Sequence, residues 1–156
     1  MDKSVKIALL AIGGAIVVGV VALVGWLASG PESGVKMANE MDQYALDYLD
    51  RYQLLSADEK LVCYYDVTLS MDGSEAAILT TQRLLYHKAG RTTAMLLAEV
   101  VDVQHHYESL IGDVIVARTG SGEMMKIEIA PLNGGETFLH ALNGTWQQAR
   151  GQPSLP

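Results

Sequence analysis

The side chains best suited to bind a metal ion are two adjacent histidines, His105 and His106, with Glu108 close behind them. Adjacent residues of a strand point to opposite faces of a sheet, so these two imidazoles cannot bind one ion unless they lie in a loop. His87 and His140 are far away in the sequence, and no cysteine pair accompanies them. We therefore interpret the pair as part of a polar loop and expect neither a metal site nor a cofactor.

The only cysteine is Cys63, which lies between Leu61 and Tyr65 on the apolar side of an alternating segment. An apolar setting raises the pKa of a thiol, which favours a buried structural cysteine over a nucleophile. Neither Ser56 nor Ser109 lies in a nucleophile-elbow pattern, and no glycine-rich loop opens a helix after a strand. No catalytic residues are predicted, and we expect a protein that is not an enzyme.

The charges exclude one large class of partner. The chain has 156 residues with 11 Lys+Arg against 18 Asp+Glu, a net charge of −7. A nucleic-acid binder needs a basic face, so no nucleic-acid partner is expected. Arg83 and Arg91 are separate arginines of the kind found on ordinary surfaces. A glycosylation triplet at residues 143–145 falls inside a predicted helix, and such triplets arise often by chance.

A stretch without any charged residue, residues 7–28, follows a short tail of residues 1–6. As a helix it reaches ~33 Å, enough to cross a hydrocarbon layer of ~30 Å. Trp26 near its far end suits the aromatic belt of a membrane interface. The stretch therefore predicts an uncleaved transmembrane helix. The alternative is a cleaved signal peptide ending at residues 28–30, although secretory apolar regions are usually shorter, about 7–15 residues.

The orientation of this span depends on few charges. Lys3 and Lys6 precede it, whereas Lys36 on the other side lies among three acidic residues. The basic excess favours an N-terminus that stays inside, which places the remainder of the chain outside the cytoplasm.

Small residues follow one stripe of the span, at Ala11, Ala15 and Gly19. Spacing by four allows two membrane helices to approach closely. The stripe raises the hypothesis of a homodimer, although alanine and glycine are common in membrane helices in any case.

A linker at residues 29–34 contains proline and glycine and no large apolar side chain. Apolar residues then recur with a helical period, which predicts an amphipathic helix over residues 35–55. Acidic side chains outnumber basic ones along it, so an anionic membrane surface would repel it. We expect its apolar stripe to pack on the domain or on a partner helix.

Beyond Ser56 the apolar period changes to two, which predicts a mainly β domain over residues 56–150. A final apolar face from Phe138 to Trp146 predicts a closing helix, and residues 151–156 are expected to form a tail without regular structure. The predicted strands are seven and short, over residues 61–69, 76–81, 83–88, 92–97, 99–104, 113–118 and 124–130.

Three segments carry a resemblance to a known family: LLSADEK at residues 54–60, ILTTQRLLY at 78–86 and VVDV at 100–103. Together with the closing helix, they resemble the bacterial pleckstrin-homology-like (PH-like) family over roughly a hundred residues, the size of a small domain. The resemblance implies a seven-stranded antiparallel barrel of two nearly orthogonal sheets, with one end plugged by the C-terminal helix. The overall fold class expected is thus α+β, mainly β, behind a transmembrane helix.

PH domains that bind phosphoinositides hold the phosphates with basic residues around the first hairpin. The corresponding loop here, residues 70–75, has two acids and no base, which argues against a phosphoinositide ligand. We expect a single-pass protein of the bacterial inner membrane that presents a non-enzymatic protein-interaction or scaffold module. Its partner would bind at an open sheet edge or beside the C-terminal helix. The alternative is a module that binds a small molecule or a lipid in the barrel mouth.

Overall fold

The computed structural model describes residues 34–68 and 74–151, which belong to the larger of the two units into which the chain divides, residues 33–156. Within these ranges no helix is both long enough and apolar enough to cross a membrane. The predicted transmembrane span with its stripe of Ala11, Ala15 and Gly19 lies outside the described residues. So do most of the linker, residues 70–73 of the 70–75 loop and residues 152–156 of the tail.

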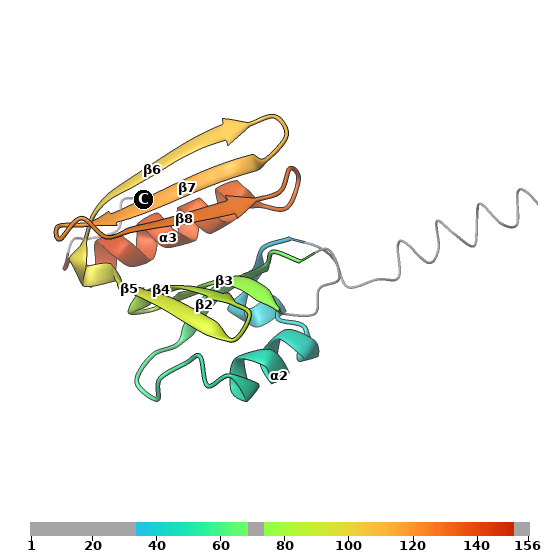
Figure 1. The fold of residues 1–156 in the computed structure, drawn as a ribbon. Helices are drawn as coiled ribbons and strands as arrows, with labels where there is room; N and C mark the ends of the chain where they lie inside the picture. The colour runs from blue at the N-terminus through green and yellow to red at the C-terminus, as the bar shows by residue number, and fades with distance from the viewer. Residues whose placement is uncertain (1–33, 69–73, 152–156) are drawn as a thin grey trace, which may run out of the picture. The chain divides into compact units, whose positions relative to one another are not determined.

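One layer of the domain is an antiparallel sheet of five strands in sequence order (Figure 1). Its first member is a strand of only two residues, β1, which pairs Lys36 with Tyr64 and Met37 with Cys63. The strands are β1 (Lys36–Met37), β2 (Leu61–Asp66), β3 (Glu75–Thr80), β4 (Arg83–Lys88) and β5 (Arg91–Leu96).

The second layer is a three-stranded antiparallel sheet, also in sequence order: β6 (Val100–Glu108), β7 (Gly112–Thr119) and β8 (Met124–Ile129). A short 3-10 helix, η2 (Leu97–Glu99), leads from the first sheet into it. The burial of β8 alternates strictly, with Met125, Ile127 and Ile129 inward, because its residues point by turns to the core and to solvent. All seven predicted strands are present.

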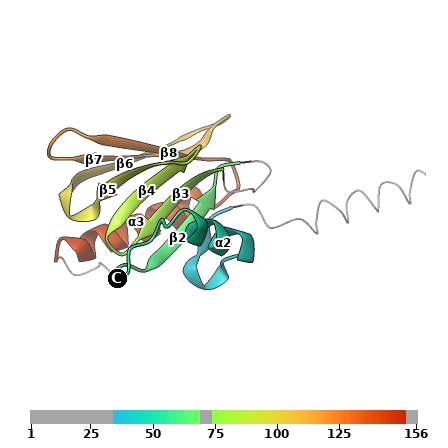
Figure 2. The same cartoon turned by 60° about the horizontal axis from the view of Figure 1, so that its bottom comes forward.

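The C-terminal helix α3 (Gly135–Ala149) packs against both sheets and completes one hydrophobic core with them (Figure 2). Phe138 and Leu142 supply its fully buried side chains. Trp146 is half-buried against the same core, and its indole Nε1 donates a hydrogen bond to the Val100 carbonyl oxygen at 2.8 Å. The prediction of a C-terminal helix that closes the domain is confirmed.

The predicted closed barrel is wrong, because among the described strands none of one sheet pairs with a strand of the other. Between β5 and β6 the chain makes the turn of η2, and Trp146 bonds to the backbone at the start of β6. Between β2 and β8 the link is a side chain: the Ala130 N–H donates to the Tyr65 hydroxyl at 3.1 Å. The domain is therefore two open sheets with a helix that contacts both.

The predicted helix over residues 35–55 is shorter in the structure. Its first part is β1 followed by a 3-10 turn, η1 (Ala38–Glu40), and the helix proper is α2 (Gln43–Arg51). The reason is a tertiary one, since pairing with β2 draws the segment into extended backbone. A second hydrophobic cluster joins α2 to the outer face of the five-stranded sheet, through Ala45, Tyr48, Leu49, Leu54, Tyr64, Ala76, Ile78 and Leu85.

Candidate functional site

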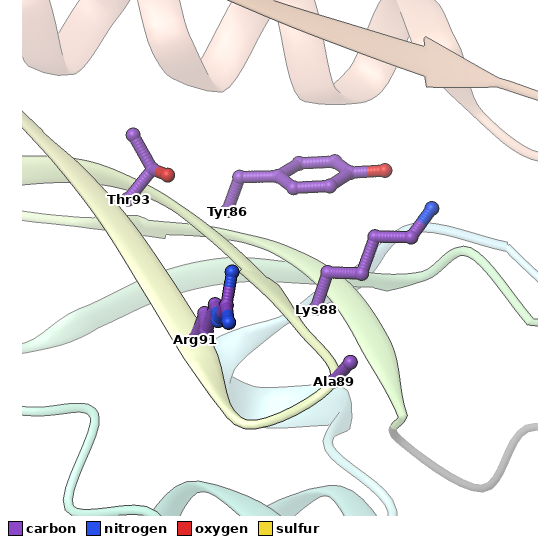
Figure 3. A pocket seen from close by; sticks show the side chains of 5 residues that line it. All are labelled: Tyr86, Lys88, Ala89, Arg91 and Thr93. Atoms are coloured by element: carbon purple, nitrogen blue, oxygen red, sulfur yellow. The ribbon is translucent and has the colours of Figure 1, made fainter.

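A pocket of about 480 Å³ lies at the hairpin between β4 and β5 (Figure 3). A two-residue turn with positive φ at Ala89 and Gly90 joins the strands, which is the backbone of a type I′ hairpin. The register sets Lys88 opposite Arg91 and Tyr86 opposite Thr93. Because residues two apart on a strand share a face, these four side chains rise together into the pocket, as Figure 3 shows.

The charges of this pocket are unevenly matched. Lys88 and Arg91 are like charges on directly opposed positions, an arrangement that destabilises a hairpin. Lys88 Nζ is paired with the Glu75 carboxylate at 3.0 Å, and the same carboxylate accepts a hydrogen bond from the Tyr86 hydroxyl. Within the described ranges Arg91 has no such partner. Counted over Lys88, Arg91 and Glu75 alone, the described charges at the pocket sum to one positive charge.

Hydrogen bonding ties two of these groups together and shifts their pKa values. Burial alone would raise the pKa of Glu75, but hydrogen bonds from Tyr86 and Lys88 lower it below the usual range of a carboxyl. Burial, and then the bond to Glu75, raise the pKa of the Tyr86 hydroxyl. Tyr86 is therefore a neutral donor at physiological pH. Glu75 is not a lining residue, but its bonds hold Tyr86 and Lys88, which line the pocket together with Arg91 and Thr93.

The strand that supplies Arg91 also forms a free edge, since β5 pairs only with β4 among the described strands. In a two-residue hairpin the positions that flank the turn exchange both backbone hydrogen bonds, and the pattern then alternates. Residues 91, 93 and 95 thus bond to β4, whereas the backbone groups of Thr92, Ala94 and Leu96 point outward. Apart from Met95, the side chains of β5 are exposed. This edge is open to another strand.

Arg83, the second arginine singled out in the sequence, lies at the other end of β4, where it pairs with Leu96 of β5. Its guanidinium forms an ion pair with Glu59, whose side chain is only 1 % exposed, and donates to the Leu54 carbonyl oxygen at 3.1 Å. Thr80 Oγ1 donates to the same carboxylate at 2.8 Å. The two arginines do not share a site, and Arg83 has a structural role: it fastens the chain after α2 to the sheet.

The adjacent histidines lie within β6 and not in a loop, so that prediction is wrong. The strand continues to Glu108 because every residue from 100 to 108 keeps or flanks a partner on β7. The two rings turn to opposite faces, as expected for neighbours on a strand: His105 Nε2 is 2.7 Å from Asp113 Oδ1, and His106 Nε2 is 2.8 Å from Glu108 Oε1. The described part of the chain contains no group of three metal-ligating side chains.

Cys63 is fully buried in the main core, and burial raises the pKa of its thiol to about 12. Such a thiol stays protonated at neutral pH and is a poor nucleophile. The triplet at residues 143–145 lies within α3, where Thr145 is buried and its hydroxyl donates to the Ala141 carbonyl oxygen at 2.8 Å. Both features belong to packing.

The pocket was not predicted from the sequence, although a signal for it existed. Ala89-Gly90 between two alternating segments is a two-residue turn, and such a turn places Lys88 opposite Arg91. Glu75, in contrast, comes from the preceding hairpin and reaches Lys88 only through the strand register.

Comparison of the chain with family models, with curated proteins and with solved structures found no match in any of the three.

Proposed function

We propose that this chain is a single-pass, membrane-anchored PH-like module that binds a protein partner and has no catalytic activity. The observation that carries the binding role is the open edge of β5, with the outward backbone groups of Thr92, Ala94 and Leu96. Exposed edge strands bind extended segments of other proteins by main-chain hydrogen bonds. Four strands, then three, then a closing helix also suit the PH-like family, with β1 as an addition to the edge.

A proline at position 94 tests strand addition with little damage to the domain. The outward N–H of Ala94 takes no part in the bonds to β4, so Ala94→Pro removes a donor that only an added strand would use. Ala94→Val keeps the N–H and serves as the matched control. A photo-crosslinking amino acid at Leu96 of the full chain reports the partner in cells. Strand addition requires a specific crosslinked protein that Ala94→Pro removes and Ala94→Val retains; a crosslink that survives the proline contradicts it.

A second candidate function is binding of an anionic small molecule or lipid headgroup in the pocket between Lys88 and Arg91. It is favoured by the excess positive charge there, because a guanidinium and an ammonium on facing positions together suit a phosphate or carboxylate. Native mass spectrometry of the gently purified full chain would detect a copurifying molecule. We expect Arg91→Gln to lose it and Arg118→Gln, a change of an exposed arginine on the other sheet, to retain it. An unliganded wild-type protein would favour the protein partner instead.

The same proposal includes a membrane anchor at residues 7–28, which lie outside the described residues. It places the domain outside the cytoplasm of a bacterial cell. Val18→Arg near the middle of the stretch should impair insertion, since a charge there costs about 2.5–3.5 kcal/mol. Reporters fused after Pro156, one active only outside the cytoplasm and one only inside, test the orientation in fractionated cells. Exported activity in the soluble fraction would instead indicate cleavage near Gly30, and the anchor would be wrong.

A further inference from the structure

Two leucines project from neighbouring turns at one end of the domain. Leu110 is 96 % exposed, and Leu132 is fully exposed. Each is the third residue of a four-residue turn: Ile111 N–H donates to the Glu108 carbonyl oxygen at 3.1 Å, and Asn133 N–H donates to the Ala130 carbonyl oxygen at 3.1 Å. The turns are neighbours because β7 begins beside the end of β8, where Asp113 pairs with Ile129.

The residue types at these positions are unusual for turns. Leu132 follows Pro131 and has φ of +67°, the conformation of the third residue of a type II turn, where glycine or asparagine is usual. A leucine there is strained and gains no packing from the described residues. Tyr107, directly before the other turn, is 59 % exposed. Leu110, Leu132 and Tyr107 together form a surface that we name the apolar tip.

The chain enters the domain at this same end. The Val35 N–H donates to the Asn133 carbonyl oxygen at 2.8 Å, so the first described residues are bonded to the residue that follows Leu132. Figure 1 shows the β6–β7 turn, the loop from β8 to α3 and the start of the described chain at one end of the domain. Between Val35 and the uncharged stretch of residues 7–28 stand only residues 29–34, which span at most about 22 Å when fully extended.

We propose that the apolar tip docks on the lipid surface next to the anchor, with Leu110 and Leu132 entering the boundary between headgroups and acyl chains. The proposal rests on the membrane anchor of the proposed function and adds an orientation of the domain to it. Apolar side chains, and not charge, drive the contact, because the two turns contain a single charged residue, the acidic Glu108, and it is bonded to His106. Tyr107 has the amphipathic ring that suits such an interface.

The test uses the full chain in phosphatidylcholine vesicles, with a polarity-sensitive fluorophore on a cysteine at Leu132→Cys or Leu110→Cys. Cys63 can stay in place because it is fully buried. Leu96→Cys is the matched control, an exposed leucine at the far end of β5. Docking requires a brighter, blue-shifted emission at positions 110 and 132, quenched by lipids with nitroxide-labelled acyl chains. Position 96 should stay aqueous, and anionic lipid should not be needed.

The other outcomes separate the orientation from the anchor. Protein that stays in the vesicles after an alkaline wash, with an aqueous fluorophore at position 132, overturns the docking and leaves the anchor intact. Release of the chain by the wash overturns both. A shifted emission that depends on protein density and ignores the nitroxide lipids indicates contact between copies of the chain and also overturns the docking. So does a shift that occurs only with anionic vesicles.

Discussion

The Tyr65 hydroxyl accepts a hydrogen bond from the Ala130 backbone N–H at 3.1 Å, and it does so where β2 and β8 come close without pairing. The bond joins the two sheets through a side chain. Tyr65 itself is buried, in the same core as Cys63 and Ile129. Its ring therefore packs in the core while its hydroxyl accepts from the backbone N–H of Ala130, the residue that follows β8 and begins the turn that holds Leu132.

Removal of this hydroxyl should loosen the contact between the sheets. We expect Tyr65→Phe to lower the free energy of unfolding by about 1–3 kcal/mol, the cost of a partly buried N–H left without its acceptor. Urea denaturation followed by circular dichroism measures the change. Tyr107→Phe, at an exposed position, is the control and should leave the midpoint in place. An equal, negligible effect of both changes would show that the bond adds nothing to stability.

The ion pair of Glu59 and Arg83 predicts a loss of stability in acid. Burial tends to raise the pKa of Glu59, but hydrogen bonds from Arg83, the Ser56 N–H and Thr80 lower it from 4.5 to about 2. A carboxyl whose pKa is lower in the folded than in the unfolded chain stabilises the folded state at every pH above its unfolded pKa. The contribution, about 3 kcal/mol, is therefore present above pH 4.5 and is lost as the pH falls toward 2.

The check is denaturant unfolding of the wild type and of Glu59→Gln between pH 7 and pH 2. The variant should be less stable at pH 7, and the two curves should converge in acid. Asp58→Asn, the same kind of change at an exposed neighbour, is the control and should cost much less stability at pH 7 than Glu59→Gln. Parallel curves for the wild type and Glu59→Gln would contradict the assignment.

His87 predicts a second, milder window of pH dependence. The ring is buried between Tyr48 and Tyr52 of the α2 segment, with ring centroids at 5.3 and 4.7 Å, and burial lowers its pKa below 6.5. Its Nδ1 contacts Thr92 Oγ1 at 2.9 Å, and its buried Nε2 has no hydrogen-bond partner among the described residues. Protonation therefore favours the unfolded state, and stability that is complete above pH 6.5 is lost as the pH falls below it.

At pH 5.5 the loss from His87 is at most about 1.4 kcal/mol, the value for a folded state that excludes the proton entirely. Unfolding midpoints at pH 8.0 and pH 5.5 measure it, and His87→Phe removes the titrating group while keeping a flat ring. The difference between the two proteins isolates this histidine from His105 and His106. An identical fall in the unfolding midpoint of both proteins would show that the pH dependence comes from other groups.

The alternating segments predicted the strands because successive side chains of a strand point to opposite faces, although β3 and β4 bury both faces, one in each hydrophobic cluster. The pattern of Met125, Ile127 and Ile129 against Lys126 and Glu128 is the clearest example. Where both faces of a strand are exposed, the sequence carried less information. Near its end, β6 is exposed on both faces. The sequence around His105 and His106 therefore shows no alternation of apolar and polar residues, and it was interpreted as a loop.

The errors elsewhere come from contacts between distant segments. Nothing local distinguishes Lys36 and Met37 from a first helical turn, since only pairing with β2 makes them a strand. The prediction of a closed barrel was wrong for a similar reason. Where β5 meets β6 and where β2 meets β8, the contacts come from the side chains of Trp146 and Tyr65, which bond to backbone groups distant in sequence. The turn residues Ala89-Gly90 were enough to predict the hairpin that carries the candidate pocket. The contact of Glu75 with this hairpin could be predicted only from the register of β3 on β4.

Trp146 predicts a large effect of truncation in α3. Its half-buried indole packs against the core and bonds to the Val100 carbonyl oxygen at 2.8 Å. Trp146→Ala should lower the free energy of unfolding by about 3 kcal/mol, near the low end for buried tryptophan because the ring is only half-buried. Trp146→Phe, which keeps much of the packing, should cost about 1 kcal/mol for the lost hydrogen bond. A domain with an unaltered melting curve after truncation would contradict the role of Trp146 in closing the core.

Leu132 predicts a gain of stability on substitution. At φ of +67° a leucine side chain crowds its own backbone, and relief of that strain amounts to about 1 kcal/mol. Asparagine tolerates this conformation, and the lost leucine side chain is fully exposed, so Leu132→Asn should raise the free energy of unfolding of the detergent-solubilised chain. Leu110→Asn, at a turn position without a positive φ, is the control and should not be stabilising.

The same Leu132→Asn change should weaken the contact with lipid, so that stability and membrane docking move in opposite directions. A variant that is no more stable than the wild type would show that the turn holds leucine without strain, and strain at Leu132 would then no longer support a contact of this side chain with lipid.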